Sequence, residues 1–170
     1  MHPLHTDLPV IYLKPGELYL AEQPTVVVTT LGSCVSMIFF HQPQQLGAIC
    51  HALLPTDHHQ EKSFRFVDRT FYWMLKQFQS RGIDPSEIQG KLFGGADVLE
   101  CIQGKCRKAT VGQQNIHRAL ELFKAHGLQV QASSLGGTWG RKIFFFTHTG
   151  EVLQKRLEKL CWLASKQWES

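Results

Sequence analysis

The sequence has no apolar run long enough to span a membrane. Its longest runs, such as 26–28 and 143–146, are far shorter than the roughly 20 residues that a transmembrane helix needs. The opening residues are polar and interrupted by Pro3, and they lack the charged-then-apolar order of a secretory leader. We therefore expect a cytoplasmic protein that does not insert into a membrane.

The sequence also lacks a large excess of charge of either sign. The chain carries 18 Lys and Arg against 14 Asp and Glu, a net charge of +4, and it has no long basic run. This balance argues against nucleic acid as a partner. With 43% apolar and 19% charged residues, the chain has the composition of a globular protein and not of a disordered one.

No repeat, low-complexity tract or long linker divides the 170 residues. A chain of this length buries about two thirds of its unfolded surface, so it needs no disulfide or metal to hold its core. We therefore expect a single domain over 1–170, whose motif-bearing core covers about 14–153.

The cysteines are few and odd in number: Cys34, Cys50, Cys101, Cys106 and Cys161. In a cytoplasmic chain this pattern predicts thiols, at least one of which has no disulfide partner within a monomer. Cys101 and Cys106 flank a basic loop, but no second cysteine pair completes a zinc site, and His58 and His59 add little. We predict a solvated loop there, and neither a metal nor a cofactor.

The first half of the chain has strand patterns, and helical patterns follow. Residues 25–30 are almost all β-branched, which predicts a strand buried on both faces. Strands are predicted over 10–13, 17–20, 25–30, 34–40, 47–54, 88–93, 128–135 and 142–147.

Three amphipathic helices are predicted between and after these strands. The first covers about 64–78, with Ser63 as its N-cap, and the second runs from Thr110, which has capping-box spacing to Gln113. The third covers about 155–168. This order predicts an α+β fold: one layered α/β/α sandwich with a mixed, largely antiparallel sheet and three main helices.

The strongest local signal is Cys34, which follows the break Leu31-Gly32-Ser33 at the first position of a strand. A thiol with an ordinary pKa of about 8.5 needs a neighbouring base to become a nucleophile. His51 is the candidate, because a hairpin around 41–44 would set Cys34 directly opposite it, with Cβ atoms about 5 Å apart.

Alternation along the strand distinguishes the two nearby thiols, because Cys50 should point to the opposite face from His51. The plainer interpretation is that Cys34 is a buried small hydrophobe, as cysteines often are. Thr29 or Thr30 could orient the imidazole by hydrogen bonding, although the default interpretation of either is an ordinary β-branched strand residue.

Several segments together resemble one family, the chemoreceptor glutamine deamidases called CheD, over about 14–153. They are Lys-Pro-Gly-Glu-Leu-Tyr at 14–19, Thr-Leu-Gly-Ser-Cys-Val at 30–35, Cys-His-Ala-Leu-Leu-Pro at 50–55, Leu-Phe-Gly-Gly-Ala at 92–96, Val-Gly-Gln-Gln-Asn-Ile at 111–116 and Leu-Gly-Gly-Thr-Trp-Gly-Arg-Lys-Ile at 135–143. Each segment is short, but all occur in the family's order.

The resemblance implies an α/β/α fold and a cysteine hydrolase that converts receptor glutamines to glutamates. It makes Cys34 the nucleophile and His51 the general base. The family's third residue is an upstream threonine; the ungapped position is Val28, so Thr29 is taken as its equivalent. Backbone N–H groups near Gly32 and Ser33 would serve the oxyanion.

The partners that the resemblance implies are chemoreceptor cytoplasmic helices and a CheC-type phosphatase. A different class of function, a docking module for either partner with a silent Cys34, stays open. So does a general cysteine amidase or esterase with other substrates.

The glycine pairs and two polar residues of the second predicted helix are expected to have no special role. The pairs at 94–95 and 136–137 are expected to be simple glycine turns, although the resemblance puts them near the active site. Gln114 and Asn115 lie in the first turns of a predicted helix, where polar side chains usually face solvent.

Overall fold

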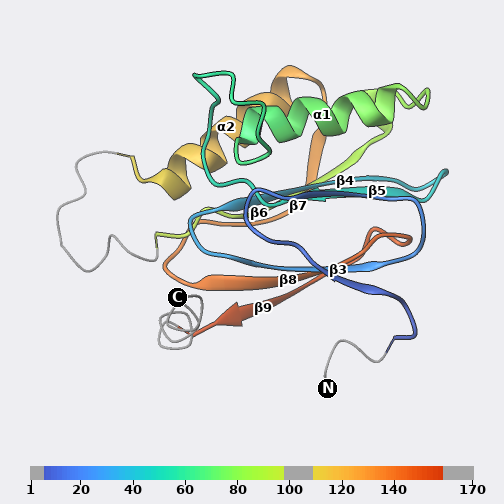
Figure 1. Ribbon diagram of the computed structural model, residues 1–170, viewed down its shortest axis with the longest axis horizontal. Coiled ribbons are helices and arrows are strands. Elements are labelled where there is room, and N and C mark those ends of the chain that lie inside the picture. Colours follow the sequence, from blue (N-terminus) through green and yellow to red (C-terminus); the bar gives the residue numbers. More distant parts are fainter. Residues whose placement is uncertain (1–5, 98–108, 159–170) are drawn as a thin grey trace.

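The computed structural model describes residues 6–97 and 109–158. Figure 1 shows their helices and strands. In chain order these elements are β1 (Val10–Tyr12), β2 (Leu18–Ala21), β3 (Val26–Leu31), β4 (Val35–His41), β5 (Leu46–Cys50), α1 (Val67–Gln79), the 3-10 helix η1 (Pro85–Glu87), β6 (Gln89–Gly94), α2 (Val111–Ala125), β7 (Gln129–Leu135), β8 (Gly140–Phe146) and β9 (Val152–Leu157).

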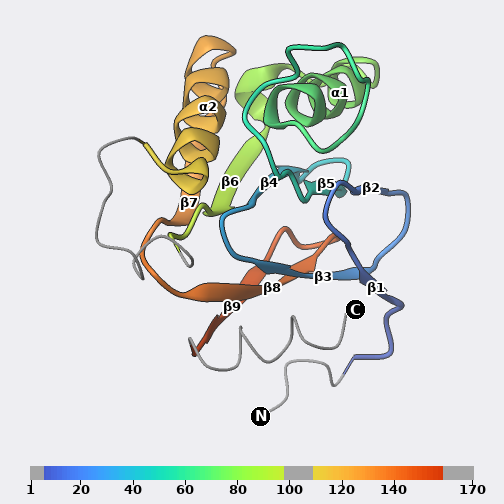
Figure 2. The same ribbon diagram turned by 60° about the vertical axis from the view of Figure 1, so that its left-hand side comes forward.

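The described strands form two stacked sheets. One sheet has four strands in the order β1-β3-β8-β9, and the other has five in the order β2-β5-β4-β6-β7. Both α-helices lie on the outer face of the five-stranded sheet, so the layers run helices, five-stranded sheet, four-stranded sheet (Figures 1 and 2). Within each sheet a single pair is parallel, β1 with β3 and β6 with β7, and the other pairs are antiparallel.

The predicted α+β class and the mixed, largely antiparallel pairing are confirmed, but the α/β/α layering is wrong. The strands form two sheets, and the second sheet occupies the layer where helices were expected. Strand patterns give the period and the burial of each segment, but they do not tell which strands hydrogen-bond to which. A strand buried on both faces fits beneath helices or beneath a second sheet equally well.

Burial along β3 and β4 follows from this layering. All seven residues of β4 are buried, because helices cover one face of the strand and the other sheet covers its second face. In β3, Val27 and Leu31 face the space between the sheets, whereas Val26 and Val28 pack with Phe144 on the other face. The prediction that this strand is buried on both faces is confirmed.

The first helix begins later than predicted. Its N-cap is Phe66, not Ser63, and Phe66 is extended. The reason is a tertiary contact: Phe66 forms a parallel bridge to Leu54, and the Arg65 carbonyl accepts the N–H groups of Leu53 and Leu54 at 2.7 and 3.0 Å. This pairing keeps the chain extended through residues whose apolar spacing alone favours helix.

The second helix begins as predicted. Thr110 is its N-cap and makes a reciprocal capping box with Gln113. The predicted C-terminal helix over 155–168 is wrong where it overlaps the structure, because β9 pairs with β8 as far as Leu157. Residues 159–168 of that segment lie outside the described residues, as do Cys101, Cys106 and Cys161.

Among the residues that the structure describes, we find no helix that is both long and apolar enough to cross a membrane.

Candidate active site

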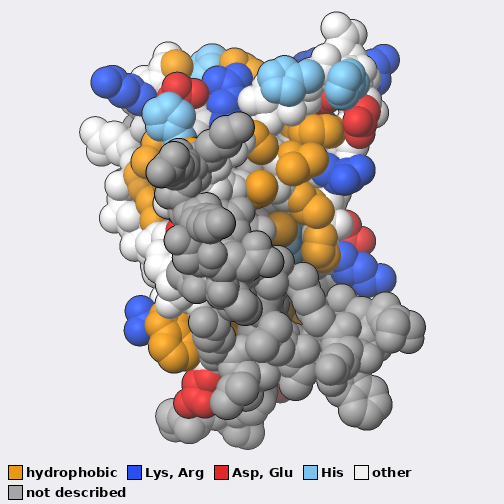
Figure 3. Space-filling view, turned by 90° about the vertical axis from the view of Figure 1, so that its left-hand side faces the viewer, with side chains coloured by type: hydrophobic (Ala, Val, Ile, Leu, Met, Phe, Trp, Pro, Cys, Tyr) orange, Lys and Arg blue, Asp and Glu red, His pale blue; other side chains and the backbone are white. Residues whose placement is uncertain are grey.

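Backbone loops from both sheets meet at one end of the molecule. The loop before β4 accepts two hydrogen bonds from the loop after β6: Gly95 N–H donates to Cys34 O and Ala96 N–H donates to Gly32 O, both at 2.9 Å. The turn between β7 and β8 joins them, because Gly136 N–H donates to Gly94 O at 2.9 Å. Figure 3 views this end of the molecule, where hydrophobic side chains lie on the surface in several patches.

Close backbone contact in this assembly requires glycine. At Gly94, where φ is +109°, an added Cβ would lie 2.2 Å from the carbonyl oxygen of Cys34. No side chain fits at that separation, so this position holds the cysteine loop directly against β6. The glycine pair at 94–95 is therefore a packing contact with the cysteine loop rather than a simple turn.

The hairpin that carries Cys34 and His51 has a different register from the predicted one. Val35 pairs with Ala52 and Ile38 with Ile49, so the register is two residues from the expected one, and Cys34 lies diagonal to His51 instead of opposite it. The turn explains the error. Gln45 takes a left-handed conformation, with φ of 48°, and its sequence carries no glycine or asparagine signal for such a turn.

The shift is an even number of residues, so both side chains still belong to the same face of the sheet. Cys34 is half-buried and packs against the apolar cluster between the sheets, which includes Leu31 and Ile49. Diagonal neighbours across an antiparallel pair lie about 7 Å apart, within reach of long and aromatic side chains. Cys34 and His51 therefore share one face at the end of the hairpin.

The second thiol lies on the other face, as predicted. Cys50 is fully buried in the core beneath the helices. Burial raises its pKa to about 11, although the Met37 N–H, 3.4 Å from Sγ, works in the opposite direction. Cys50 therefore stays protonated at neutral pH.

Thr29 contacts His51 across the two sheets. Its Oγ1 lies 2.7 Å from His51 Nδ1 and 2.9 Å from the carbonyl oxygen of Leu13. A carbonyl can only accept, so the single hydroxyl proton goes to Leu13 O, and Oγ1 must accept a proton from Nδ1–H. This arrangement assigns the neutral imidazole its Nδ1–H tautomer and leaves the lone pair on Nε2.

The alternative residue, Thr30, lies on the opposite face of β3 by strand alternation and is only partly buried. Of the two threonines that the sequence left open, Thr29 is the one that contacts the histidine.

His51 is almost completely buried, with 2% of its surface exposed. Burial lowers its pKa to about 4, and the Leu13 carbonyl and the charge of Glu17 offset only part of this effect. The ring is therefore neutral at physiological pH, which is the state of a general base that is ready to accept a proton.

Two carbonyl contacts orient the peptide groups before Cys34. The Gly32 carbonyl accepts from Ala96, and the Ser33 carbonyl accepts from Asn115 Nδ2 at 3.1 Å. In a planar trans peptide the N–H points away from the C=O, and the described chain contains no cis bond. The N–H groups of Ser33 and Cys34 therefore point away from these two contacts.

Asn115 is a residue that sequence reasoning missed. It was expected to face solvent, but it is fully buried, and its Nδ2 also donates to the Leu53 carbonyl at 2.9 Å. The helical pattern treats it as one more polar residue in a first turn. Only its place in the segment at 111–116 that resembles the family could have singled it out.

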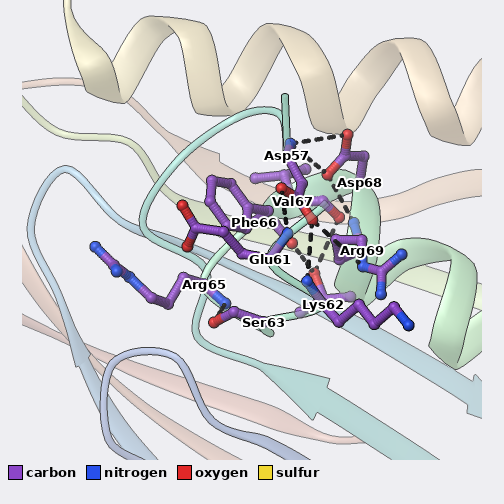
Figure 4. Close-up of polar contacts among 10 residues, drawn as sticks. Asp57, Glu61, Lys62, Ser63, Arg65, Phe66, Val67, Asp68 and Arg69 are labelled. Carbon is purple, nitrogen blue, oxygen red and sulfur yellow. Dashed lines mark hydrogen bonds and ion pairs between the residues drawn. The ribbon is translucent and has the colours of Figure 1, made fainter. Parts of the chain in front are cut away.

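A single buried carboxylate organises the loop that follows the histidine segment (Figure 4). The side chain of Asp57 is 2% exposed, accepts the N–H groups of Glu61 and Lys62 at 3.0 and 3.3 Å, and lies 3.7 Å from Arg69 Nε. Burial opposes its ionisation, but these N–H groups and the Arg69 charge together lower its pKa. The loop is thereby closed against the start of α1.

The described residues contain no group of three or more His, Cys, Asp or Glu side chains that could hold a metal ion. His58 and His59 are both exposed.

Comparison with known proteins gives a consistent result. The family model for CheD chemotactic sensory transduction matches residues 53–156. A probable chemoreceptor glutamine deamidase, CheD 2 of Geobacter sulfurreducens, is 50% identical over 91% of this chain and 94% of its own length. A second, from Maridesulfovibrio salexigens, is 38% identical over 91% of this chain and 95% of its own length.

Among solved structures, the Bacillus licheniformis hypothetical protein YfiH has a TM-score of 0.49 and 13% identity, over 72% of this chain and 51% of that one. The sequence relatives, with the family model, are decisive. The resemblance found in the sequence motifs is confirmed, and the chain belongs to the CheD family.

Proposed function

We propose that this protein is a chemoreceptor glutamine deamidase, which hydrolyses glutamine side chains of chemotaxis receptors to glutamate and ammonia. The names of its relatives support this substrate and reaction. The observation that carries the proposal is the bond from His51 Nδ1 to Thr29, because it leaves Nε2 as the basic atom of an imidazole on the face that Cys34 shares.

In the first step, His51 Nε2 takes the Cys34 proton and the thiolate attacks the δ-carbonyl carbon of the glutamine. The imidazolium that forms keeps its Nδ1–H bond to Thr29, so the ring holds its orientation while its charge changes. A carbon–sulfur bond forms and the carbonyl π bond opens to an oxyanion.

The oxyanion needs donors that are already oriented. We assign this role to backbone N–H groups of the segment Gly32-Ser33-Cys34, whose carbonyls are held by Ala96 and Asn115. When the tetrahedral intermediate collapses, His51 gives its proton to the leaving nitrogen, so the C–N bond breaks and ammonia leaves.

The second half-reaction hydrolyses the thioester. Neutral His51 takes a proton from water, the hydroxide adds to the thioester carbonyl, and the C–S bond breaks as the thiol recovers the proton. The net change is glutamine plus water to glutamate plus ammonia. Each step uses only groups of this chain and water, so the proposal includes no cofactor.

The proposal places the protein in the cytoplasm, where it would meet the cytoplasmic helices of receptors. A CheC-type phosphatase is the second partner that we propose. The resemblance at 30–35 and 50–55 supports both, and binding to an immobilised phosphatase of this type is the direct test of the second.

The test of the reaction is mass spectrometry of a receptor cytoplasmic fragment after incubation with the protein. Wild type should add about one mass unit at each modified glutamine, and Cys34→Ala and His51→Ala should add none. Cys50→Ala is the matched control, because it removes the adjacent thiol on the opposite face and should retain conversion. Conversion by Cys34→Ala would contradict the assigned nucleophile. Binding to the fragment without any conversion by wild type would leave a docking module as the function.

A further inference from the structure

Asn115 connects the two segments that carry the candidate nucleophile and base. The last backbone pair of the hairpin is Val35 with Ala52, and beyond it the strands separate. If the ladder continued, the Ser33 carbonyl would accept from Leu54 N–H, but that N–H donates to Arg65 O at 3.0 Å. Asn115 Nδ2 takes its place and bonds the carbonyls of Ser33 and Leu53 at 3.1 and 2.9 Å.

The orientation of this amide is fixed by its partners. Both partners are carbonyl oxygens, which only accept, so the nitrogen and not the oxygen must face them. Both Nδ2 protons are used in these two bonds, so Asn115 has none to offer a substrate. It can act on the reaction only through Ser33 and Leu53.

The oxygen atom of the Asn115 amide destabilises the folded protein. Asn115 is 0% exposed, and its Oδ1 has no hydrogen-bond partner among the described residues. Burying an acceptor without a partner destabilises the folded state, because the lost hydrogen bonds to water are not replaced. An apolar side chain would avoid this cost but would leave two backbone carbonyls unsatisfied, so the two donated bonds are what asparagine provides here.

Independent contacts hold α2 against the loop after β6, which is itself hydrogen-bonded to the carbonyls of Gly32 and Cys34. An added Cβ on Gly112 would lie 2.5 Å from Gly95 O, so the first turn of the helix touches the loop backbone directly. Thr110, the N-cap, also donates to Asp97, which follows the same loop. The helix therefore presents Asn115 to Ser33 from a fixed position.

We propose that Asn115 is a positioning residue for the deamidation reaction. By holding the Ser33 carbonyl it sets the plane of the Ser33–Cys34 peptide, and with it the direction of the Cys34 N–H. By holding Leu53 as well, it fixes the separation of the Cys34 and His51 segments beyond the end of their ladder. This inference rests on the proposed function, but the alkylation experiment below does not depend on receptor turnover.

The variants are Asn115→Ala, which removes both donors, and Asn115→Ser, which keeps one. Two controls accompany them. Gln114→Ala alters the exposed neighbour on the same helical turn, whose side-chain amide donates to the Ala109 carbonyl. Phe78→Leu lowers stability through the buried core at the C-terminal end of α1, away from the site. Thermal unfolding is measured for these four variants and for wild type.

The first readout is the rate at which iodoacetamide alkylates Cys34 as a function of pH, followed on the Cys34 peptide by mass spectrometry because the chain has five cysteines. We expect Asn115→Ala to slow alkylation at neutral pH by about tenfold and to alter its dependence on pH, because the Cys34 thiol is no longer held in place relative to His51. The second readout is deamidation of the receptor fragment, where kcat should fall by roughly 10- to 100-fold with KM unchanged. Asn115→Ser should fall between wild type and Asn115→Ala, and both controls should match wild type.

Wild-type alkylation rates and pH profile in both Asn115 variants, with only the unfolding temperature lowered, would overturn the inference and leave a structural role. If Asn115→Ala does not fold, the alkylation rate and pH profile of Asn115→Ser are compared with those of wild type instead. If wild type modifies no receptor glutamine but Asn115→Ala still slows Cys34 alkylation, the proposed function fails while the positioning role stands.

Discussion

Acid should destabilise this protein through His51 in particular. Burial lowers the pKa of His51 to about 4, against 6.5 for the imidazole in an unfolded chain. Between these values the unfolded state binds a proton that the folded state does not. Stability therefore rises with pH across this window: the contribution is complete above about 6.5 and is lost as pH falls toward 4.

The magnitude follows from the size of the displacement. Each pH unit between the folded and unfolded pKa is worth about 1.4 kcal/mol, so His51 contributes about 3 kcal/mol across the window. The side chain is nearly fully buried, so solvent does not screen this contribution. For a chain of this length, such a loss lowers the unfolding temperature by roughly 10 °C.

The assay is urea unfolding of wild type and His51→Gln at a series of pH values from neutral to about 4. Glutamine does not titrate, so the His51 contribution is present in wild type alone. All other titrating groups are common to both proteins, and their contribution cancels in the difference. We expect wild type to lose about 3 kcal/mol more than His51→Gln across the window.

Two results would refute the reasoning. A flat difference between the two proteins would mean that the ring is solvated or that its pKa is not lowered. A difference of opposite sign, with wild type gaining stability relative to His51→Gln on acidification, would mean that the resting protein holds an imidazolium stabilised by a Cys34 thiolate. In that case the proton transfer that we assign to the first catalytic step would already have occurred before substrate binds.

Other expectations concern single groups. Thr29→Val removes the acceptor of the Nδ1 proton and should lower kcat for deamidation by about 10- to 100-fold; Thr29→Ser should restore most of it, and Thr30→Val should match wild type. Cys50 should resist iodoacetamide at neutral pH while Cys34 reacts, as peptide mass spectrometry can show, since burial raises the Cys50 pKa to about 11. Thr110→Ala removes the α2 cap and should cost about 1 kcal/mol in urea unfolding.

The candidate pair could be found from sequence because face parity survives an error in register. The expected register differs from the observed one by two residues. Because this displacement is even, Cys34 and His51 still lie on one face of the sheet and Cys50 on the other, as predicted. The distance between the two side chains does not survive such an error. It depends on a turn in which Gln45 adopts a positive φ, and a glutamine gives no local signal of that conformation.

The layers and the supporting residues could not be derived in the same way. Helix and strand periods describe each segment alone, whereas the division into two sheets depends on pairings between distant segments, such as Val35 with Gly94 and Leu31 with Arg141. Asn115 illustrates the limit on the scale of one side chain. Its burial results from the approach of Gly112 to Gly95, a contact between two segments whose separation in space no local pattern encodes.

The arrangement of the base has a consequence for how the site is assembled. Thr29 belongs to β3 of the four-stranded sheet, while His51 follows β5 of the five-stranded sheet, and the bond between them crosses the space where the two sheets pack. The tautomer that leaves Nε2 basic therefore depends on the packing of the two sheets and not on either sheet alone. The backbone at Cys34 is positioned by other contacts, which come from the loop after β6 through Gly95 and from α2 through Asn115. The candidate nucleophile and the candidate base are thus oriented from opposite layers of the fold, and their alignment requires all three layers to be in place.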